Sequence, residues 1–321
     1  MPSRRDFLMA GGALAVAGPA ARAQSGPLKV TGARPTIFYA PLIATVTQGF
    51  LKKHGVDADF HWLGTTPLAE GLKNGSVDVI QSAVSSFWTL SDRDETTIPV
   101  HIAEINRRDG FFLLRRGAIQ TGDGPAFDWR QLEGKTIVAE LGGQPAHMLR
   151  YALSYNKVDP SKVRLVDGGT GPALRAAFRS GAGDFAHFQG AVAQQVELDG
   201  EGAIVTSVGA SMPEVSFSTV CALPQFVQHP AYRPFLAAFA QAKAWAHSAP
   251  ARVVAENVAP QFSDTSLDAM IKAVQAYQRL GCWAGPLGVS RAHYDQALAV
   301  FRAAGAVKGD YAFEQACISP P

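Results

Sequence analysis

The sequence contains few cysteines, no excess of charge and no long hydrophobic run. Its three cysteines include no C-x-x-C pair and no Cys/His spacing typical of a metal site. The 29 basic and 27 acidic residues nearly balance and form no basic block. This balance argues against nucleic acid or an anionic membrane as a partner. No segment is long and apolar enough to predict a transmembrane helix.

The common motifs of catalysis are also missing. The chain has no G-x-S-x-G elbow, no H-E-x-x-H, no P-loop with its lysine, and no G-x-G-x-x-G after the first predicted strand. Nothing in the spacing of the other residues calls for a cofactor. We therefore expect a protein that is not an enzyme and that needs neither cofactor nor metal.

The N-terminus has the features of an export signal. Residues 3–8, SRRDFL, form a twin-arginine pattern, a short apolar stretch follows, and residues 21–23, ARA, form a small-x-small cleavage site. We predict that residues 1–23 are a signal peptide cleaved near Ala23, and that the mature chain begins near Gln24. No cysteine follows the cleavage site, which argues against a lipid anchor. Removing three arginines and one aspartate with the signal leaves 26 basic and 26 acidic residues, so the mature chain is neutral.

In an oxidising compartment, two of the cysteines could be joined in a disulfide or remain free thiols. Cys282 and Cys317 could form a disulfide, with Cys221, in the apolar run FSTVCAL, as a buried thiol. The sequence does not decide whether the pair meets, because disulfide geometry depends on the fold.

One structural unit occurs twice in the chain. Residues 64–79, GTTPLAEGLKNGSVDV, and residues 169–185, GTGPALRAAFRSGAGDF, both have Gly-Thr-x-Pro, a short helical pattern, a glycine, and an aspartate that begins an apolar strand. At a constant offset of 106, Gly75, Asp78 and Gln81 match Gly181, Asp184 and His187. We infer two similar α/β units.

The elements around each copy follow the order βαβαβ. In the first copy we predict strands at 28–33, 56–63 and 77–81, with a helix led by Pro41 and ending at Gly55 between the first two. In the second copy the predicted strands are 135–141, 163–166 and 184–188. This order implies parallel strands with right-handed crossovers, and such sheets bind ligands at their carboxyl ends.

Two apolar runs link the units. FFLLRR at 111–116 and EVSFSTVCAL at 214–223 are interpreted as two crossings between lobes. The remainder, from about Pro230 to Ala304, reads as helical, and we expect it to pack on the first lobe. The predicted domains are therefore a first lobe of residues 24–112 and 215–321 and a second lobe of residues 113–214.

The residues of the repeat resemble a known family. YAPLIATVTQGFLKKHGVDADFHWLGTTPLAEGLKNGSVDVIQS resembles the opening of the solute-binding proteins of nitrate, sulfonate, taurine and thiamine-precursor ABC importers, and LEGKTIVAELGGQPAHMLRYAL resembles their second lobe. The resemblance covers most of residues 28–225. It implies a bilobal periplasmic-binding-protein fold, an α/β fold whose two parallel or mixed sheets are joined by two crossover strands. It also implies a monomer that closes over one small molecule and delivers it to a membrane permease.

The candidate ligand contacts lie in the loops that follow the predicted strands. Helix N-termini in these loops favour anions, and consecutive glycines allow close approach of the backbone. The matching loops line the cleft in the family, which strengthens the expectation for Tyr39, Ser82, Gly143 and Gln189. The candidates are Tyr39, Pro41, Thr65, Thr66, Ser82, Ser85 and Ser86 from the first lobe, and Gly142, Gly143, Gln144, His147, Thr170, Phe188 and Gln189 from the second.

Several candidates have an alternative interpretation. Ser82, Thr65 and Thr170 are equally well explained as N-caps. Trp88 is a candidate for stacking on a flat ligand or for the core. Glu214 is a candidate partner for a ligand ammonium or ring N–H, whereas the pair Arg107-Arg108 is interpreted as a solvated turn.

The expected ligand is a small organic molecule. The loops offer hydroxyl, amide and aromatic groups, which favour an organic anion such as a sulfonate or aromatic acid, with an aminopyrimidine also possible. Two other functions remain open. The same fold hosts lyases and a pyrimidine synthase, and a periplasmic sensor subunit would use the same closing lobes.

Overall fold

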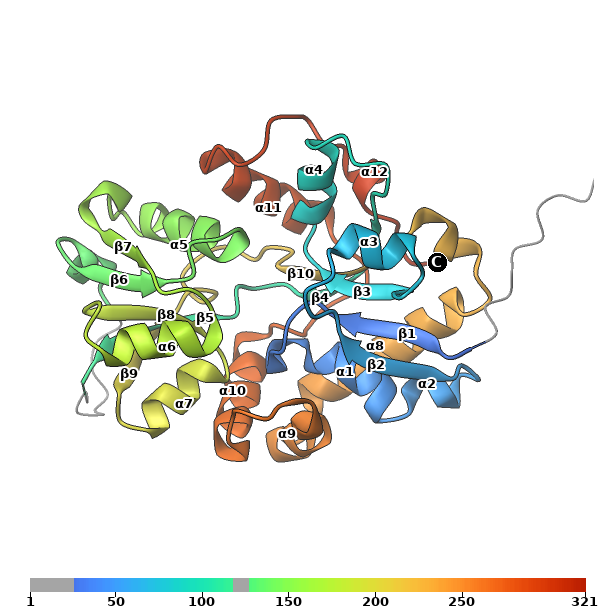
Figure 1. Ribbon diagram of the computed structural model, residues 1–321, viewed down its shortest axis with the longest axis horizontal. Coiled ribbons are helices and arrows are strands. Elements are labelled where there is room, and N and C mark those ends of the chain that lie inside the picture. Colours follow the sequence, from blue (N-terminus) through green and yellow to red (C-terminus); the bar gives the residue numbers. More distant parts are fainter. Residues whose placement is uncertain (1–25, 118–126) are drawn as a thin grey trace, which may run out of the picture.

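The computed structural model describes residues 26–117 and 127–321, and two five-stranded mixed sheets flanked by helices form its framework (Figure 1). The predicted signal peptide therefore lies outside the described residues. No helix among the described residues is both long and apolar enough to span a membrane.

The first sheet has the strand order β2-β1-β3-β10-β4. β1 is parallel to β2 and β3, whereas β10 is antiparallel to β3 and β4. Its strands are β1 (Leu28–Gly32), β2 (Ala58–Trp62), β3 (Val79–Ser82), β4 (Val100–Asn106) and β10 (Ser218–Ala222). Its helical segments are η1 (Ile37–Tyr39), α1 (Ala40–Thr47), α2 (Phe50–Lys53), α3 (Leu68–Lys73) and α4 (Ser85–Ser91).

The second sheet repeats this arrangement with the order β7-β6-β8-β5-β9. β6 is parallel to β7 and β8, and β5 is antiparallel to β8 and β9. Its strands are β5 (Phe111–Arg116), β6 (Thr136–Ala139), β7 (Arg164–Asp167), β8 (Phe185–Gln189) and β9 (Gly202–Ser207). Its helical segments are η2 (Trp129–Leu132), α5 (Gln144–Tyr155), η3 (Pro160–Lys162), α6 (Gly171–Arg179) and α7 (Val192–Leu198).

The two repeat aspartates have the same structural task. The Asp78 carboxylate accepts a hydrogen bond from the Lys29 N–H at 2.8 Å, and the Asp184 carboxylate accepts one from the Thr136 N–H at 2.9 Å. Each aspartate thereby joins the start of the third strand of its unit to the first strand. The predicted fold class, two similar α/β lobes, is confirmed.

The first predicted helix is interrupted. It was expected to run from Pro41 to Gly55, but α1 ends at Thr47 and α2 starts at Phe50, with Gly49 between them at φ 69°. The left-handed conformation of Gly49 breaks the helical hydrogen-bond pattern and suits a residue without a side chain.

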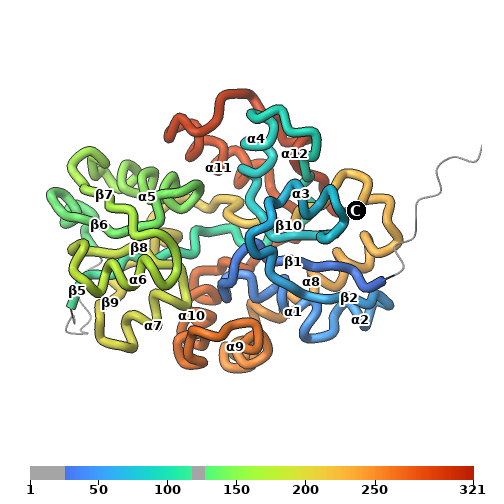
Figure 2. The backbone as a smooth tube through the Cα atoms, viewed as in Figure 1, coloured from blue at the N-terminus to red at the C-terminus, as the bar shows by residue number. Residues whose placement is uncertain are grey.

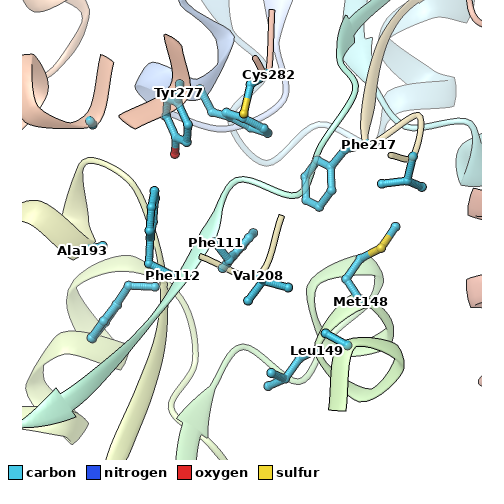
Figure 3. Packing of buried hydrophobic residues seen from close by; sticks show 14 of the residues in the cluster. Phe111, Phe112, Met148, Leu149, Ala193, Val208, Phe217, Tyr277 and Cys282 are labelled. Carbon is cyan, nitrogen blue, oxygen red and sulfur yellow. The ribbon is translucent and has the colours of Figure 1, made fainter. Parts of the chain in front are cut away.

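The crossings lie beside the two predicted runs. FFLLRR forms β5 within the second sheet, and Ser218–Ala222 forms β10 within the first, so the chain crosses between the sheets in residues 107–110 and 208–217 (Figure 2). A cluster of buried apolar side chains lies beside both crossings. Figure 3 shows Phe111, Phe217, Met148 and Tyr277 gathered there.

The C-terminal part is helical, as predicted, but it contacts both lobes. α8 packs on α1 and α2 of the first lobe, whereas α10 contacts α7 and α11 contacts α5 of the second. The expected packing on the first lobe is present, and α10 and α11 add contacts with the second lobe. Its elements are η4 (Pro224–Gln228), α8 (Tyr232–Ser248), α9 (Ala251–Val258), η5 (Ala259–Gln261), α10 (Leu267–Leu280), α11 (Arg291–Ala303) and α12 (Phe313–Ala316).

The three cysteines are free thiols buried in the protein. The possible disulfide between Cys282 and Cys317 is not formed. Burial raises the pKa of Cys317 and Cys221 to about 12, and it raises that of Cys282 as well. None of the three is therefore a thiolate at neutral pH.

Candidate functional site

The loops that leave β1 and β6 meet between the two sheets. Arg34 lies two residues after β1 and Glu140 lies one residue after β6. Arg34 Nη1 donates to Glu140 Oε2 at 2.8 Å and to Oε1 at 2.9 Å, and Nη2 donates to Gln189 Oε1 at 3.3 Å. These contacts join the carboxyl ends of β1, β6 and β8, the edge at which open α/β sheets bind ligands.

The ion pair is partly shielded from water. The side chain of Arg34 is 35% exposed and that of Glu140 is 18% exposed. Although burial opposes the charged form of Arg34, the neighbouring Tyr39 and Glu140 raise the pKa of the guanidinium above its usual value. Burial is the main cause of the raised pKa of Tyr39, and the neighbouring Arg34 and Ser218 act against it. Arg34 is therefore a fixed positive charge in an environment of reduced polarity.

A buried histidine lies beside this pair. The ring of His187 is fully buried and stacks on Phe111 at a centroid distance of 4.4 Å, and the Arg34 guanidinium lies 5.9 Å from the same Phe111 ring. Burial lowers the pKa of His187 to about 3, and the charge of Arg34 contributes to the shift. The imidazole is therefore neutral. Within the described chain, neither of its ring nitrogens has a hydrogen-bond partner.

Four of the predicted contacts lie around Arg34 or between the lobes. Gln189 contacts Arg34 directly, and Tyr39 lies close enough to Arg34 to influence its pKa. Gln144, at the start of α5, donates from Nε2 to the Phe217 carbonyl at 2.9 Å and so links the second lobe to the second crossing. Gly143 precedes this helix at φ 66°, a conformation that favours glycine. Gly143 is also exposed to solvent.

Ser82 ends β3 and is almost fully buried. Its carbonyl accepts a hydrogen bond from Gln81 Nε2 at 3.1 Å, and Gln81 Oε1 accepts one from the Ala33 N–H at 3.2 Å. Gln81 thus fixes the start of the loop that carries Arg34.

Trp88 is part of the core. Its ring is fully buried, its Nε1 donates to the Tyr294 hydroxyl at 2.8 Å, and it packs edge-on against Tyr294 and Phe301, each at a centroid distance of 5.4 Å. A ligand-stacking role for Trp88 is therefore not supported. Phe188 is likewise buried, against Phe178 at 5.9 Å.

The remaining candidates of the first lobe have structural surroundings. Pro41 is buried in the first turn of α1. Ser85 and Ser86 begin α4, where the Ser85 carbonyl accepts a hydrogen bond from Thr89. Thr65 and Thr66 precede α3, whose N-cap is Pro67.

In the second lobe, His147 is half-buried and packs edge-on against Phe301 at 4.9 Å. Burial is the main cause of its lowered pKa. Thr170 is exposed and precedes α6, and Gly142 is exposed before α5. The N-cap interpretation is wrong for Thr65 and Ser82, because the N-caps of α3 and α4 are Pro67 and Val84. Thr170 does occupy the N-cap of α6, although its side chain makes no capping hydrogen bond.

Glu214 belongs to a different cluster. Its carboxylate pairs with Arg108 at 3.0 Å, with Arg107 at 3.9 Å and with His293 Nε2 at 3.2 Å, and the His293 Nδ1 lies 3.0 Å from the buried Glu104 carboxylate. The interpretation of Arg107-Arg108 as a solvated turn is wrong, because both side chains take part in this network. Glu214 is held by cations of the protein, so a contact with a ligand ammonium is not supported.

Surface shape alone does not mark the Arg34 site. A broad hollow of about 890 Å³ lies along the outer edge of the first sheet, lined by residues that include Leu28, Lys52, Asp59 and Pro234, and it shares no residue with the ion pair. No group of three or more His, Cys, Asp or Glu residues within 26–117 and 127–321 is placed to hold a metal ion. The charge and hydrogen-bonding capacity at the strand ends therefore identify the candidate site.

Arg34 and Glu140 were missed by the sequence analysis. Each lies directly beyond the first strand of its repeat, so their position at a carboxyl end was available as a signal. Their pairing was not, because it joins residues 106 positions apart through the packing of two lobes.

Comparison with known proteins agrees with this architecture. No protein-family model matches the chain. "Putative binding protein YtlA" of Bacillus subtilis (strain 168) is 28% identical over 258 residues, which cover 78% of this chain and 75% of that protein. The alkanesulfonate-binding protein SsuA from Xanthomonas axonopodis pv. citri, bound to MOPS, gives a TM-score of 0.65 at 14% identity, covering 92% of this chain and 98% of that chain.

The periplasmic nitrate-binding protein NrtA from Synechocystis PCC 6803 also gives a TM-score of 0.65, at 16% identity, covering 90% of this chain and 84% of that chain. The two structural likenesses cover 92% and 90% of this chain. The chain has the periplasmic-binding-protein fold.

Proposed function

We propose that the protein is an exported ligand-binding component of an ABC importer, which captures a small organic molecule between its lobes and delivers it to a membrane permease. The observation that carries the proposal is the position of Arg34. It places a permanent positive charge where the carboxyl ends of β1, β6 and β8 meet. The fold and the names of the similar proteins support the proposal.

The geometry favours a ligand with an anionic group. The Arg34 guanidinium can bind a carboxylate or sulfonate through several N–H donors. The N-terminus of α5, after Gly143, adds backbone N–H groups and a partial positive charge from the second lobe. A ligand held by both groups stabilises the closed arrangement, because it bridges the lobes.

The lobes proposed to close over the ligand are residues 24–112 with 215–321 and residues 113–214. Because Phe111 and Phe112 pair with β8, we propose that the second lobe begins at Phe111 rather than at residue 113. Export by the segment 1–23, with cleavage near Ala23, would release the mature protein into the periplasm as a monomer.

Ligand binding is tested by thermal unfolding and calorimetry. The mature protein from Gln24 is unfolded, freed of bound molecules and refolded, and a panel of sulfonates, aromatic acids, aminopyrimidines and nitrate is added. A compound at a hundred times its Kd adds about 2.7 kcal/mol to the free energy of unfolding, which raises Tm by a few degrees.

Arg34→Gln should abolish the response to anions. Arg252→Gln is the matched control, because Arg252 lies on the exposed surface of α9 and pairs with Glu256. A response that survives Arg34→Gln contradicts the proposed site. A ligand that is consumed during the incubation indicates an enzyme, and the absence of any response contradicts the binding function.

A further inference from the structure

The Arg34–Glu140 pair restricts the kind of ligand that can enter. Among the described residues, Arg34 is the one basic side chain paired with the Glu140 carboxylate. A ligand carboxylate or sulfonate that binds Arg34 competes with Glu140 for the same N–H groups. A ligand with no other charge would therefore separate Glu140 from its cation.

Within the described part of the chain, no second basic side chain pairs with Glu140. Its side chain is only 18% exposed, and closure over a ligand shields it further from water. His187, the neighbouring titratable ring, is fully buried and neutral. Leaving a shielded carboxylate without a partner is strongly unfavourable. A purely anionic ligand therefore gains binding free energy from its contact with Arg34 and loses part of it because Glu140 is left unpaired.

A ligand with both charges avoids this loss. We infer that the site recognises a dipolar molecule, in which an anionic group binds Arg34 and an ammonium or amidinium group binds Glu140. This inference rests on the proposed ligand-binding function and specifies its substrate class. Such a ligand replaces the Arg34–Glu140 ion pair by two ion pairs with itself, so that both side chains keep a partner when the lobes close.

The surrounding groups fit such a ligand. Gln189 presents an amide oxygen, which now accepts from Arg34 at 3.3 Å, and a buried Nε2 that has no partner within the described chain. These two atoms can serve the cationic and anionic ends respectively. The buried Phe111 ring, 5.9 Å from the guanidinium, packs behind Arg34 and helps to hold it in place.

The test compares matched compounds by calorimetry on the refolded mature protein. The dipolar probes are β-alanine, γ-aminobutyrate, 2-aminoethanesulfonate and 4-(aminomethyl)benzoate. Their matched anions are propanoate, butanoate, ethanesulfonate and 4-methylbenzoate, and ethylamine serves as the cation. We expect at least one dipolar probe to bind at least about tenfold more tightly than its matched anion.

Glu140→Gln separates recognition from simple competition. The variant should weaken the dipolar probe and strengthen the matched anion, so that the preference disappears. Glu256→Gln, at the exposed surface pair of α9, should leave both affinities unchanged. If Glu140→Gln increased the affinity for dipolar and anionic probes by the same factor, Glu140 would only compete with the ligand for Arg34. That result would overturn the inference.

The remaining outcomes are also decisive. If the anions bind as tightly as the dipolar probes, the inference fails while the proposed function stands. If an aminopyrimidine or nitrate binds and no dipolar probe does, the inference fails in the same way. If no compound of any class binds, the proposed function fails together with it.

Discussion

Replacing Trp88 by alanine should destabilise the fold and spare the ligand site. The indole is fully buried between α4 and α11, where it packs edge-on against Tyr294 and Phe301 and lies 6.2 Å from the Tyr311 ring. Its N–H donates to the Tyr294 hydroxyl at 2.8 Å. Trp88→Ala removes all of these contacts and leaves a cavity that the surrounding rings cannot fill.

The size of the effect follows from the burial. Tryptophan-to-alanine changes in a packed core cost about 3–5 kcal/mol. For a chain of this length we expect Tm to fall by about 6–10 °C. Trp88→Phe keeps an aromatic ring but loses the hydrogen bond to Tyr294, so it should cost only about 1–2 kcal/mol.

Thermal unfolding and ligand titration of the same samples separate stability from binding. Gln189→Ala serves as the contrasting variant, because Gln189 contacts Arg34 and is only partly buried. We expect Trp88→Ala to lose stability and keep its ligand affinity below its lowered Tm, and Gln189→Ala to do the reverse. A Trp88→Ala protein with an unchanged Tm and lost binding would refute this reasoning and place the indole in the ligand site.

Two further predictions concern the crossings between the lobes. Burial raises the pKa of Asp109 to about 7 from its usual 3.8, so the folded protein keeps a proton that the unfolded chain releases, and stability should fall as pH rises from about 4 to about 7. Asp109→Asn should remove this fall, so that its Tm advantage over the parent is larger at pH 8 than at pH 4; an equal difference at both pH values would contradict the assignment. Tyr277→Phe removes a hydroxyl that donates to the Gly110 and Gly190 carbonyls at 3.0 and 3.1 Å, and urea unfolding should show a loss of about 0.5–1.5 kcal/mol, whereas no loss would mean that these carbonyls find other donors.

The repeated unit could be predicted from the sequence because its signals are local. Glycine and proline mark where each helix starts and ends, and the aspartate in each copy hydrogen-bonds to the first strand of its own unit. Asp78 and Asp184 therefore carry the same structural information at matching positions. The two α/β lobes follow from this pattern without knowledge of how the lobes pack.

The roles of single side chains could not be predicted in the same way. Trp88 follows a serine cluster at a strand end, a setting that suits a ligand contact, yet its ring turns toward α11, more than two hundred residues later in the chain. The role of Glu214 could not be predicted for the same reason, because its partners Arg108 and His293 belong to the first crossing and to the C-terminal helices. Contacts of this range depend on the packing of the C-terminal region, whose sequence has only a helical periodicity.

The repeat also explains why the proposed site contains two opposite charges. Lys29 and Thr136 are equivalent, since each pairs with the aspartate of its unit, so Arg34 and Glu140 fall within one residue of equivalent positions beyond β1 and β6. Facing units bring these positions together, and two identical copies would place like charges against each other, which is destabilising. Because the two copies differ at these positions, the contact between Arg34 and Glu140 is an attraction. Under the proposed function, the fold sets where the ligand meets the chain, and the difference between the two copies sets which charges we expect the ligand to carry.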